Sequence, residues 1–135
     1  MQFQPFFPAN LQTIALANVG LTTTQNVVTG GANGTKIESL VITNTDTIDH
    51  ALLFTMNVAG VLANVCNINV PANTGNLQTL PLNLFANTNL AFLPQDASGN
   101  KYMYLANGSC SLCVSSNSAA ASGKAIGISG QAAQF

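Results

Sequence analysis

The chain has 135 residues, of which 47% are hydrophobic and only 5% are charged, and its formal net charge is -1. High hydrophobic content with little net charge excludes a disordered chain. Three lysines and no arginine exclude a nucleic-acid partner, and no apolar run approaches the ~20 residues of a membrane span. Soluble domains usually carry charge on roughly a quarter of their residues. This surface must therefore present neutral amides and hydroxyls, which suit packing against other protein.

The first nine residues combine aromatic side chains with prolines. Proline removes a backbone donor and is poorly suited to a central strand, so we expect an extended arm over residues 1–10 and a single domain over residues 11–135. The arm can cover its own domain or bury its phenylalanines on a neighbouring subunit. Aromatic anchors are common at interfaces, so the sequence predicts a partner interface made of Phe3, Phe6, Phe7, Pro5 and Pro8. The segment lacks basic residues and a long apolar stretch, so we expect neither a signal peptide nor a membrane anchor.

The remaining hydrophobic pattern predicts strands almost throughout. Short runs rich in β-branched residues alternate with polar positions and are separated by turn residues such as Gly30-Gly31-Ala32-Asn33-Gly34 and Pro71-Ala72-Asn73-Thr74-Gly75. The expected strands are Leu11–Leu16, Gln25–Thr29, Lys36–Thr43, Ala51–Val58, Val58–Val70, Tyr102–Leu105, Ser109–Ser115 and Ala125–Ser129. Their spacing favours an all-β protein with a single antiparallel β-sandwich of jelly-roll-like form.

Three connections have distinct predictions. Asn107-Gly108 is a typical hairpin turn and is expected to join Lys101–Ala106 to Ser109–Ser116. The segment Leu80–Pro94, with prolines at both ends, is expected to cross between strands as a loop that includes one helical turn. Ser115–Gly123 contains only Ser, Ala, Asn and Gly, and is expected to be a slender loop before the last strand.

Three cysteines cannot all pair within one chain, which favours reduced thiols. Cys110 and Cys113 have the spacing of a zinc or redox motif. They lie in an expected strand, however, where residues three apart point to opposite faces, and only Cys66 and His50 remain to complete a ligand set. We therefore expect buried hydrophobic cysteines, with no metal and no cofactor.

Asp46, Asp49 and His50 lie within five residues and have the chemistry for cation binding or acid–base work. A turn in which the side chains of Asn44-Thr45-Asp46 bond their own backbone explains the run better, and it places His50 in a loop or at a strand edge. No serine has an evident His and Asp partner. The sequence does not predict an enzyme.

Three passages carry a resemblance to a known family. They are Lys36–Asp46 (KIESLVITNTD), Val70–Gly75 followed by Leu82–Leu84, and Leu93–Leu105 (LPQDASGNKYMYL) followed by Gly108. Together they span roughly Thr35 to Phe135, and they resemble small virion proteins of tailed bacteriophages. The resemblance implies a β-sandwich or jelly-roll structural subunit, made in the host bacterial cytoplasm and located in the virion as a head decoration, tail or adaptor component. None of the three passages contains a catalytic motif.

Two functions remain open. The first is a capsid decoration or cement subunit that binds between major capsid subunits or to other virion subunits and forms a homo-oligomer. The second is an adaptor or receptor-binding module of a tail or head fibre that binds carbohydrate. Tyr102 and Tyr104 are its stacking candidates, since residues two apart share one face of a strand.

Overall fold

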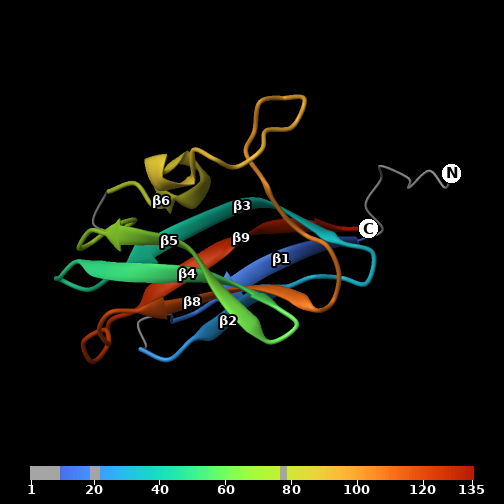
Figure 1. Ribbon diagram of the computed structural model, residues 1–135. Coiled ribbons are helices and arrows are strands. Elements are labelled where there is room, and N and C mark those ends of the chain that lie inside the picture. Colours follow the sequence, from blue (N-terminus) through green and yellow to red (C-terminus); the bar gives the residue numbers. More distant parts are fainter. Residues whose placement is uncertain (1–9, 19–21, 77–78) are drawn as a thin grey trace, which may run out of the picture.

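Two antiparallel sheets pack face to face to form the molecule (Figure 1). The structure is a computed structural model that describes residues 10–18, 22–76 and 79–135. Most strands begin and end within three residues of the predicted ranges, because burial alternation and turn residues depend on near neighbours in the chain. The last strand extends to Gln134, beyond the predicted end at Ser129, and the short strand Leu82–Asn83 was not predicted. The prediction of an all-β sandwich is confirmed. Residues 1–9 of the expected arm, with Phe3, Phe6, Phe7, Pro5 and Pro8, lie outside the described residues, and Asn10 already belongs to a strand.

Each sheet draws its strands from distant parts of the chain. Sheet A has the order β1-β9-β3-β6, and β7 also pairs with β3; its strands are β1 (Asn10–Leu16), β3 (Thr35–Asn44), β6 (Leu82–Asn83), β7 (Met103–Leu105) and β9 (Ile126–Gln134). Sheet B has the order β2-β8-β4-β5; its strands are β2 (Gln25–Thr29), β4 (His50–Val58), β5 (Val61–Val70) and β8 (Cys110–Ser116). The strand expected from Val58 to Val70 begins at Val61, because Ala59 and Gly60 form the turn between β4 and β5 with positive φ.

The hydrophobic core lies between the sheets. From sheet A, Ile37, Leu40 and Ile42 are fully buried, and from sheet B Leu52 and Phe54 meet them. A bulge between Ile37 and Ser39 shifts the alternation of β3, so that Leu40 still faces inward. Burial of these aliphatic and aromatic side chains is the main force holding the sheets together.

The segment from Leu80 to Pro94 closes one side of the sandwich. It contains two short 3-10 helices, η1 (Leu84–Ala86) and η2 (Thr88–Leu90), where one helical turn was expected. Helix η1 contacts β3 in sheet A and η2 contacts β5 in sheet B. Leu84 and Leu90 are buried beneath them, so the segment bridges the two layers.

The predicted hairpin at Asn107-Gly108 is wrong. Strand β7 pairs with β3 in sheet A, whereas β8 pairs with β2 and β4 in sheet B, so the turn carries the chain from one layer to the other. The side chain of Asn107 accepts a hydrogen bond from the Ser109 amide, and its carbonyl accepts one from the Cys110 amide. The turn chemistry was read correctly, but it does not determine which strand each flanking segment pairs with.

Candidate functional site

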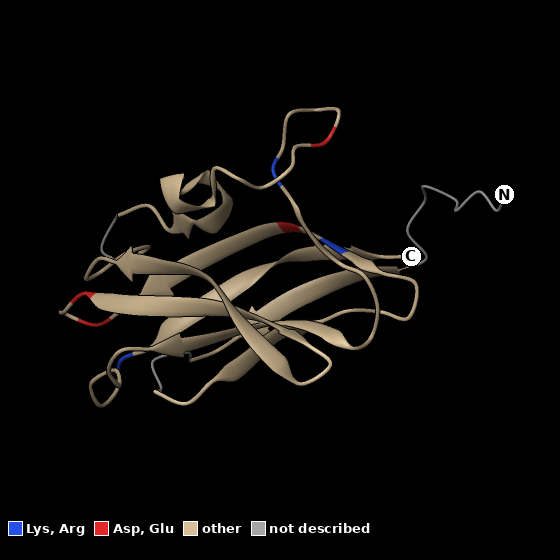
Figure 2. Cartoon of the chain, in the orientation of Figure 1, with Lys and Arg blue, Asp and Glu red and all other residues tan. Residues whose placement is uncertain are grey.

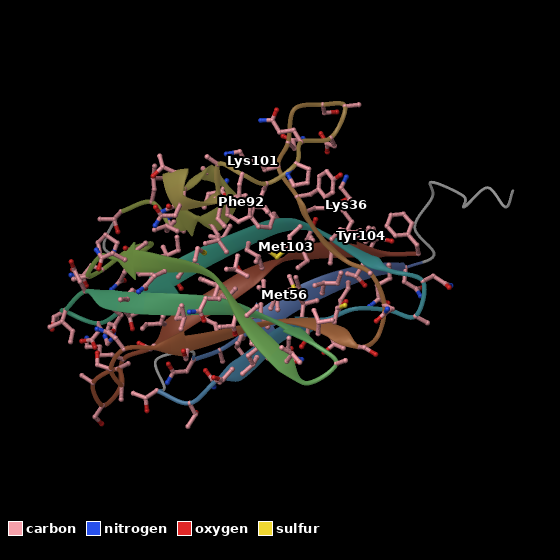
Figure 3. The ribbon with its side chains drawn as sticks, viewed as in Figure 1. Lys36, Met56, Phe92, Lys101, Met103 and Tyr104 are labelled. Atoms are coloured by element: carbon pink, nitrogen blue, oxygen red, sulfur yellow. The ribbon has the colours of Figure 1, made fainter. Side chains whose placement is uncertain are left out.

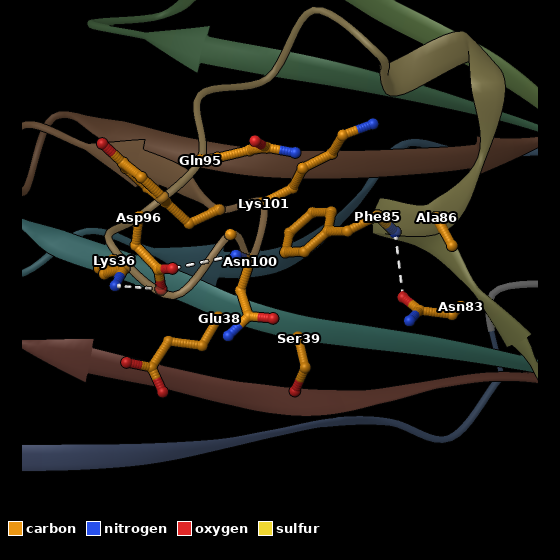
Figure 4. A pocket seen from close by; sticks show the side chains of 12 residues that line it. Lys36, Glu38, Ser39, Asn83, Phe85, Ala86, Gln95, Asp96, Asn100 and Lys101 are labelled. Atoms are coloured by element: carbon orange, nitrogen blue, oxygen red, sulfur yellow. Dashed lines mark hydrogen bonds and ion pairs between the residues drawn. The ribbon is translucent and has the colours of Figure 1, made fainter.

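A gap in the edge of sheet A creates a polar concavity. Strand β7 pairs with β3 as far as Ile37, and β6 pairs with it from Val41 onward. Among the described residues, no strand pairs with residues 38–40 on this side of β3. The loop between Gln95 and Tyr102 and the 3-10 helix η1 form the walls on either side of this gap (Figure 4).

The resulting pocket has a volume of about 580 Å3. It is lined by four of the seven charged residues of the chain, although charge is scarce everywhere else. Its lining residues are Lys36, Glu38, Ser39, Asn83, Phe85, Ala86, Gln95, Asp96, Gly99, Asn100, Lys101 and Tyr102. Figure 2 shows these charges on β3 and on the loop beside it, apart from the charges at the far end of the molecule.

Asp96 and Lys36 hold one wall of the pocket in place. The Asp96 carboxylate accepts hydrogen bonds from the backbone amides of Asn100 and Ser98, at 3.0 and 2.9 Å, and lies 3.4 Å from the Lys36 ammonium. The backbone hydrogen bond from Asn100, with those from Ser98 and Lys36, lowers the pKa of Asp96 below its ordinary value. Lys36 also lies 5.0 Å from the centre of the Tyr102 ring. These contacts tie the loop to β3.

The other polar side chains of the pocket remain available to a ligand. Within the described part of the chain, Glu38, Ser39, Gln95, Asn100 and Lys101 make no side-chain hydrogen bond or ion pair. One carboxylate, one ammonium, one hydroxyl and two amides therefore surround the cavity without protein partners. Such groups can donate and accept hydrogen bonds in several directions at once.

The two tyrosines have different surroundings. Tyr102 lines the pocket, as the carbohydrate-binding alternative requires. Tyr104 pairs with Lys36 across β7 and β3, and its ring lies 6.5 Å from that of Phe135, at the end of the sheet (Figure 3). Tyr104 is not among the residues that line this pocket.

A second polar cluster lies at the opposite end of the sandwich. The Oδ2 atom of Asp46 lies 2.9 Å from Nε2 of His50, and Nδ1 of His50 lies 3.1 Å from the Ser118 hydroxyl. The Asp46 carboxylate also accepts hydrogen bonds from the backbone amides of Ala121 and Thr47. The hydrogen bond from His50, followed by that from Ala121, lowers the pKa of Asp46 to about 2.

Two sequence predictions are corrected by this cluster. His50 is the first residue of the interior strand β4 and is fully buried, so it lies neither in a loop nor on an edge strand. A serine does have a His and Asp partner, because Ser118 reaches His50 across 68 positions of sequence. The prediction for the turn itself is confirmed: Asn44 accepts from the Asp46 amide, and Asp46 accepts from the Thr47 amide.

All three cysteines are free thiols. Cys110 and Cys113 are buried in β8, and burial raises the pKa of the half-buried Cys66 to about 11. In the residues that the structure describes, no group of three or more His, Cys, Asp and Glu side chains is placed to hold a metal ion. Nor does any helix in this part of the chain have the length and hydropathy needed to cross a bilayer.

Comparisons with protein-family models, with curated proteins and with solved structures gave no match for this chain. Its function must therefore be argued from its own surfaces.

Proposed function

We propose that this protein is a structural subunit of a bacteriophage virion, and specifically a capsid decoration or cement protein that binds between major capsid subunits. The observation that carries the proposal is the absence of charge from sheet B. None of its strands β2, β4, β5 and β8 contains a Lys, Arg, Asp or Glu residue. Figure 2 shows this layer without blue or red segments along its strands.

The outer face of sheet B is neutral. Edge strand β5 presents the exposed residues Asn64, Asn67 and Asn69, which pair across the sheet with Thr55, Leu53 and Ala51 of β4. Next to them, β8 presents Ser111 and Ser115. Amides and hydroxyls around small apolar groups allow many hydrogen bonds without the desolvation cost of burying charges.

The strand order supports the same class of protein. We infer that the two sheets form a jelly roll, because β1, β9, β3 and β6 face β2, β8, β4 and β5, with the chain passing repeatedly between the layers. Double-sheet jelly rolls recur in viral capsid proteins and in lectins. This is an argument by analogy of fold, and it adds to the argument from surface chemistry.

The expected N-terminal arm completes the proposal. Its phenylalanines would anchor the subunit on a neighbour, a major capsid protein or another copy of this chain, while the neutral sheet supplies the broader contact. Repeated copies on a lattice make weak contacts collectively durable, because engagement at one site raises the effective concentration at the next. The protein would then act in the virion as a homo-oligomer, by binding and not by catalysis.

Cryo-EM of the particle that carries this protein tests the proposal. Density repeated over the capsid lattice, with sheet B against a capsid subunit, is the expected result. Density confined to a tail, a fibre or one vertex would overturn the decoration role.

A paired variant adds a binding measurement. Asn67→Glu places one negative charge on the outer face of sheet B, and Ser98→Glu places the same charge on an exposed loop of the other sheet. We expect only Asn67→Glu to reduce the occupancy of particles. Equal occupancy for both variants would show that sheet B is not the binding face.

A further inference from the structure

We propose that the pocket between β6 and β7 binds an uncharged saccharide. The inference concerns a different face from the proposed assembly surface. The pocket opens at the edge of sheet A, whereas the assembly surface is the outer face of sheet B. Either can therefore fail without the other.

The backbone of sheet A shapes the site. Among the described residues, no strand pairs with residues 38–40 on the outer side of β3, between Ile37↔Met103 and Val41↔Asn83, whereas β9 pairs with its other side. The gap is shorter than the roughly five or six residues of a typical strand, and β7 and β6 already occupy β3 at its two ends. The volume of about 580 Å3 instead lies within the ~300–1,000 Å3 typical of small-molecule sites.

The wall beside this gap is organised before any ligand binds. Asp96 uses its carboxylate for the amides of Ser98 and Asn100 and for Lys36, so it fixes the loop and does not serve the ligand. The Asn83 side chain accepts from the Phe85 amide and fixes the start of η1 on the other side. Walls held in this way reduce the entropy lost on binding.

The free groups match hydroxyls better than ions. Glu38 and Lys101 carry opposite charges, and so do Asp96 and Lys36, so the four charges sum to zero. A phosphate would meet the two carboxylates, and a metal cation would meet the two ammonium groups. A polyol can instead donate hydrogen bonds to Glu38 and accept them from Lys101, while the amides of Gln95 and Asn100 do both.

Two aromatic residues supply the apolar part of the wall. Phe85 lines the cavity from η1 and points its ring toward the centre of the view in Figure 4, and Tyr102 lines it from the loop. Sugar rings combine hydroxyl edges with patches of C–H groups, and aromatic side chains pack against such patches. A pocket with mixed polar groups and a small aromatic surface therefore fits a saccharide better than a lipid, which would leave the polar groups unpaired.

Titration followed by 15N–1H NMR of the full chain tests the proposal. The probes are glucose, galactose, mannose, N-acetylglucosamine, lactose and maltose, with inorganic phosphate and calcium as ionic comparisons. For at least one saccharide we expect saturable shifts in the amides of Ser39, Gln95, Asn100 and Lys101. Phosphate and calcium should give no saturable shift there.

Matched variants identify the site. Glu38→Ala and Lys101→Ala each remove one free group, and we expect each to weaken binding about tenfold, the loss of one hydrogen bond to a charged group. Lys124→Ala makes the same change on an exposed loop away from the pocket and should leave binding unchanged. Thermal unfolding of all three variants verifies that each is folded.

Three outcomes would overturn the inference. The first is the absence of saturable shifts for every saccharide up to about 100 mM, which corresponds to a binding free energy of only ~1.4 kcal/mol. The second is binding that Glu38→Ala and Lys101→Ala leave unchanged. The third is a preference for phosphate or calcium, which would assign the pocket to an ion.

Discussion

The Oδ2 atom of Asp46 lies 2.9 Å from Nε2 of His50, and both side chains are buried where three loops meet. The backbone carbonyl of Asp46 accepts from the Asn73 amide, and its carboxylate accepts from the Ala121 amide. Because an ionised carboxylate only accepts, Nε2 carries the hydrogen. The pair therefore joins the loop after β3 to the loops after β5 and β8.

This arrangement predicts acid sensitivity. Folding lowers the pKa of Asp46 from 3.8 to about 2, so the folded state favours the ionised form. The resulting stabilisation is fully present above pH 3.8 and is lost as the pH falls toward about 2. Asp46→Asn should be less stable than the wild type at neutral pH, and the difference should shrink over this range. Urea denaturation between pH 2 and pH 7 measures it, and a constant difference would contradict the prediction.

The backbone at Gly130, inside sheet A, leaves no room for a side chain. A Cβ atom at this position would overlap the carbonyl oxygen of Ser39 on the neighbouring strand, at the bulge of β3. Gly130→Ala should destabilise the protein by roughly 1–3 kcal/mol, the usual cost of overpacking.

Gly31→Ala is the control, because its Cβ would meet only ordinary contacts of 3.5 Å or more. Urea denaturation of both variants measures the difference. Equal stability would show that sheet A adapts to the added methyl group without cost.

We expect a substitution of Thr55 to stabilise the protein. Its Oγ1 atom is buried and has no hydrogen-bond partner among the described residues. Valine has nearly the same shape without the hydroxyl, so Thr55→Val should raise the free energy of unfolding by about 1 kcal/mol. Thr13→Val, at an exposed position of β1, should change it little. Chemical denaturation measures the free energy of unfolding of both variants. A Thr55→Val variant less stable than the wild type would mean that the hydroxyl stabilises the folded state.

The neutral surface predicts that association is insensitive to salt. If copies of the chain associate, or bind a capsid subunit, through sheet B, no charge pair is available there to be screened. The association constant should vary less than about twofold between roughly 0.05 and 1 M salt, where the Debye length falls to ~3 Å. Sedimentation velocity or light scattering measures it. Dissociation at moderate salt would point to an interface that includes the charged pocket instead.

Sequence patterns determined the local features of this fold. Alternating burial along β3 and the turn residues around Asn44 and Asp46 were predicted because each depends on near neighbours in the chain. Sheet membership depends on distant pairing, and for this reason the strands on either side of Asn107 were wrongly joined.

The candidate sites were harder to predict, for the same reason. The pocket exists because β6 and β7 stop short of each other along β3, and no local pattern encodes that register. Tyr102, a stacking candidate from the sequence, lines this pocket, whereas the sequence did not single out Glu38 and Lys101. Ser118 lies in a stretch of small residues, and nothing in the sequence around it indicates that it contacts His50.

The position of β9 has a consequence for synthesis on the ribosome. It forms the middle of sheet A, with Ile128 pairing to Leu16 on one side and to Ile42 on the other. Before residues 126–134 leave the ribosome, β1 and β3 lack the strand that pairs with both of them. Their apolar side chains then stay exposed to other nascent chains. Folding therefore waits for a late segment, as expected for a topology of distant pairings. A stalled or shortened translation product would accumulate as an aggregation-prone fragment instead of a smaller folded domain.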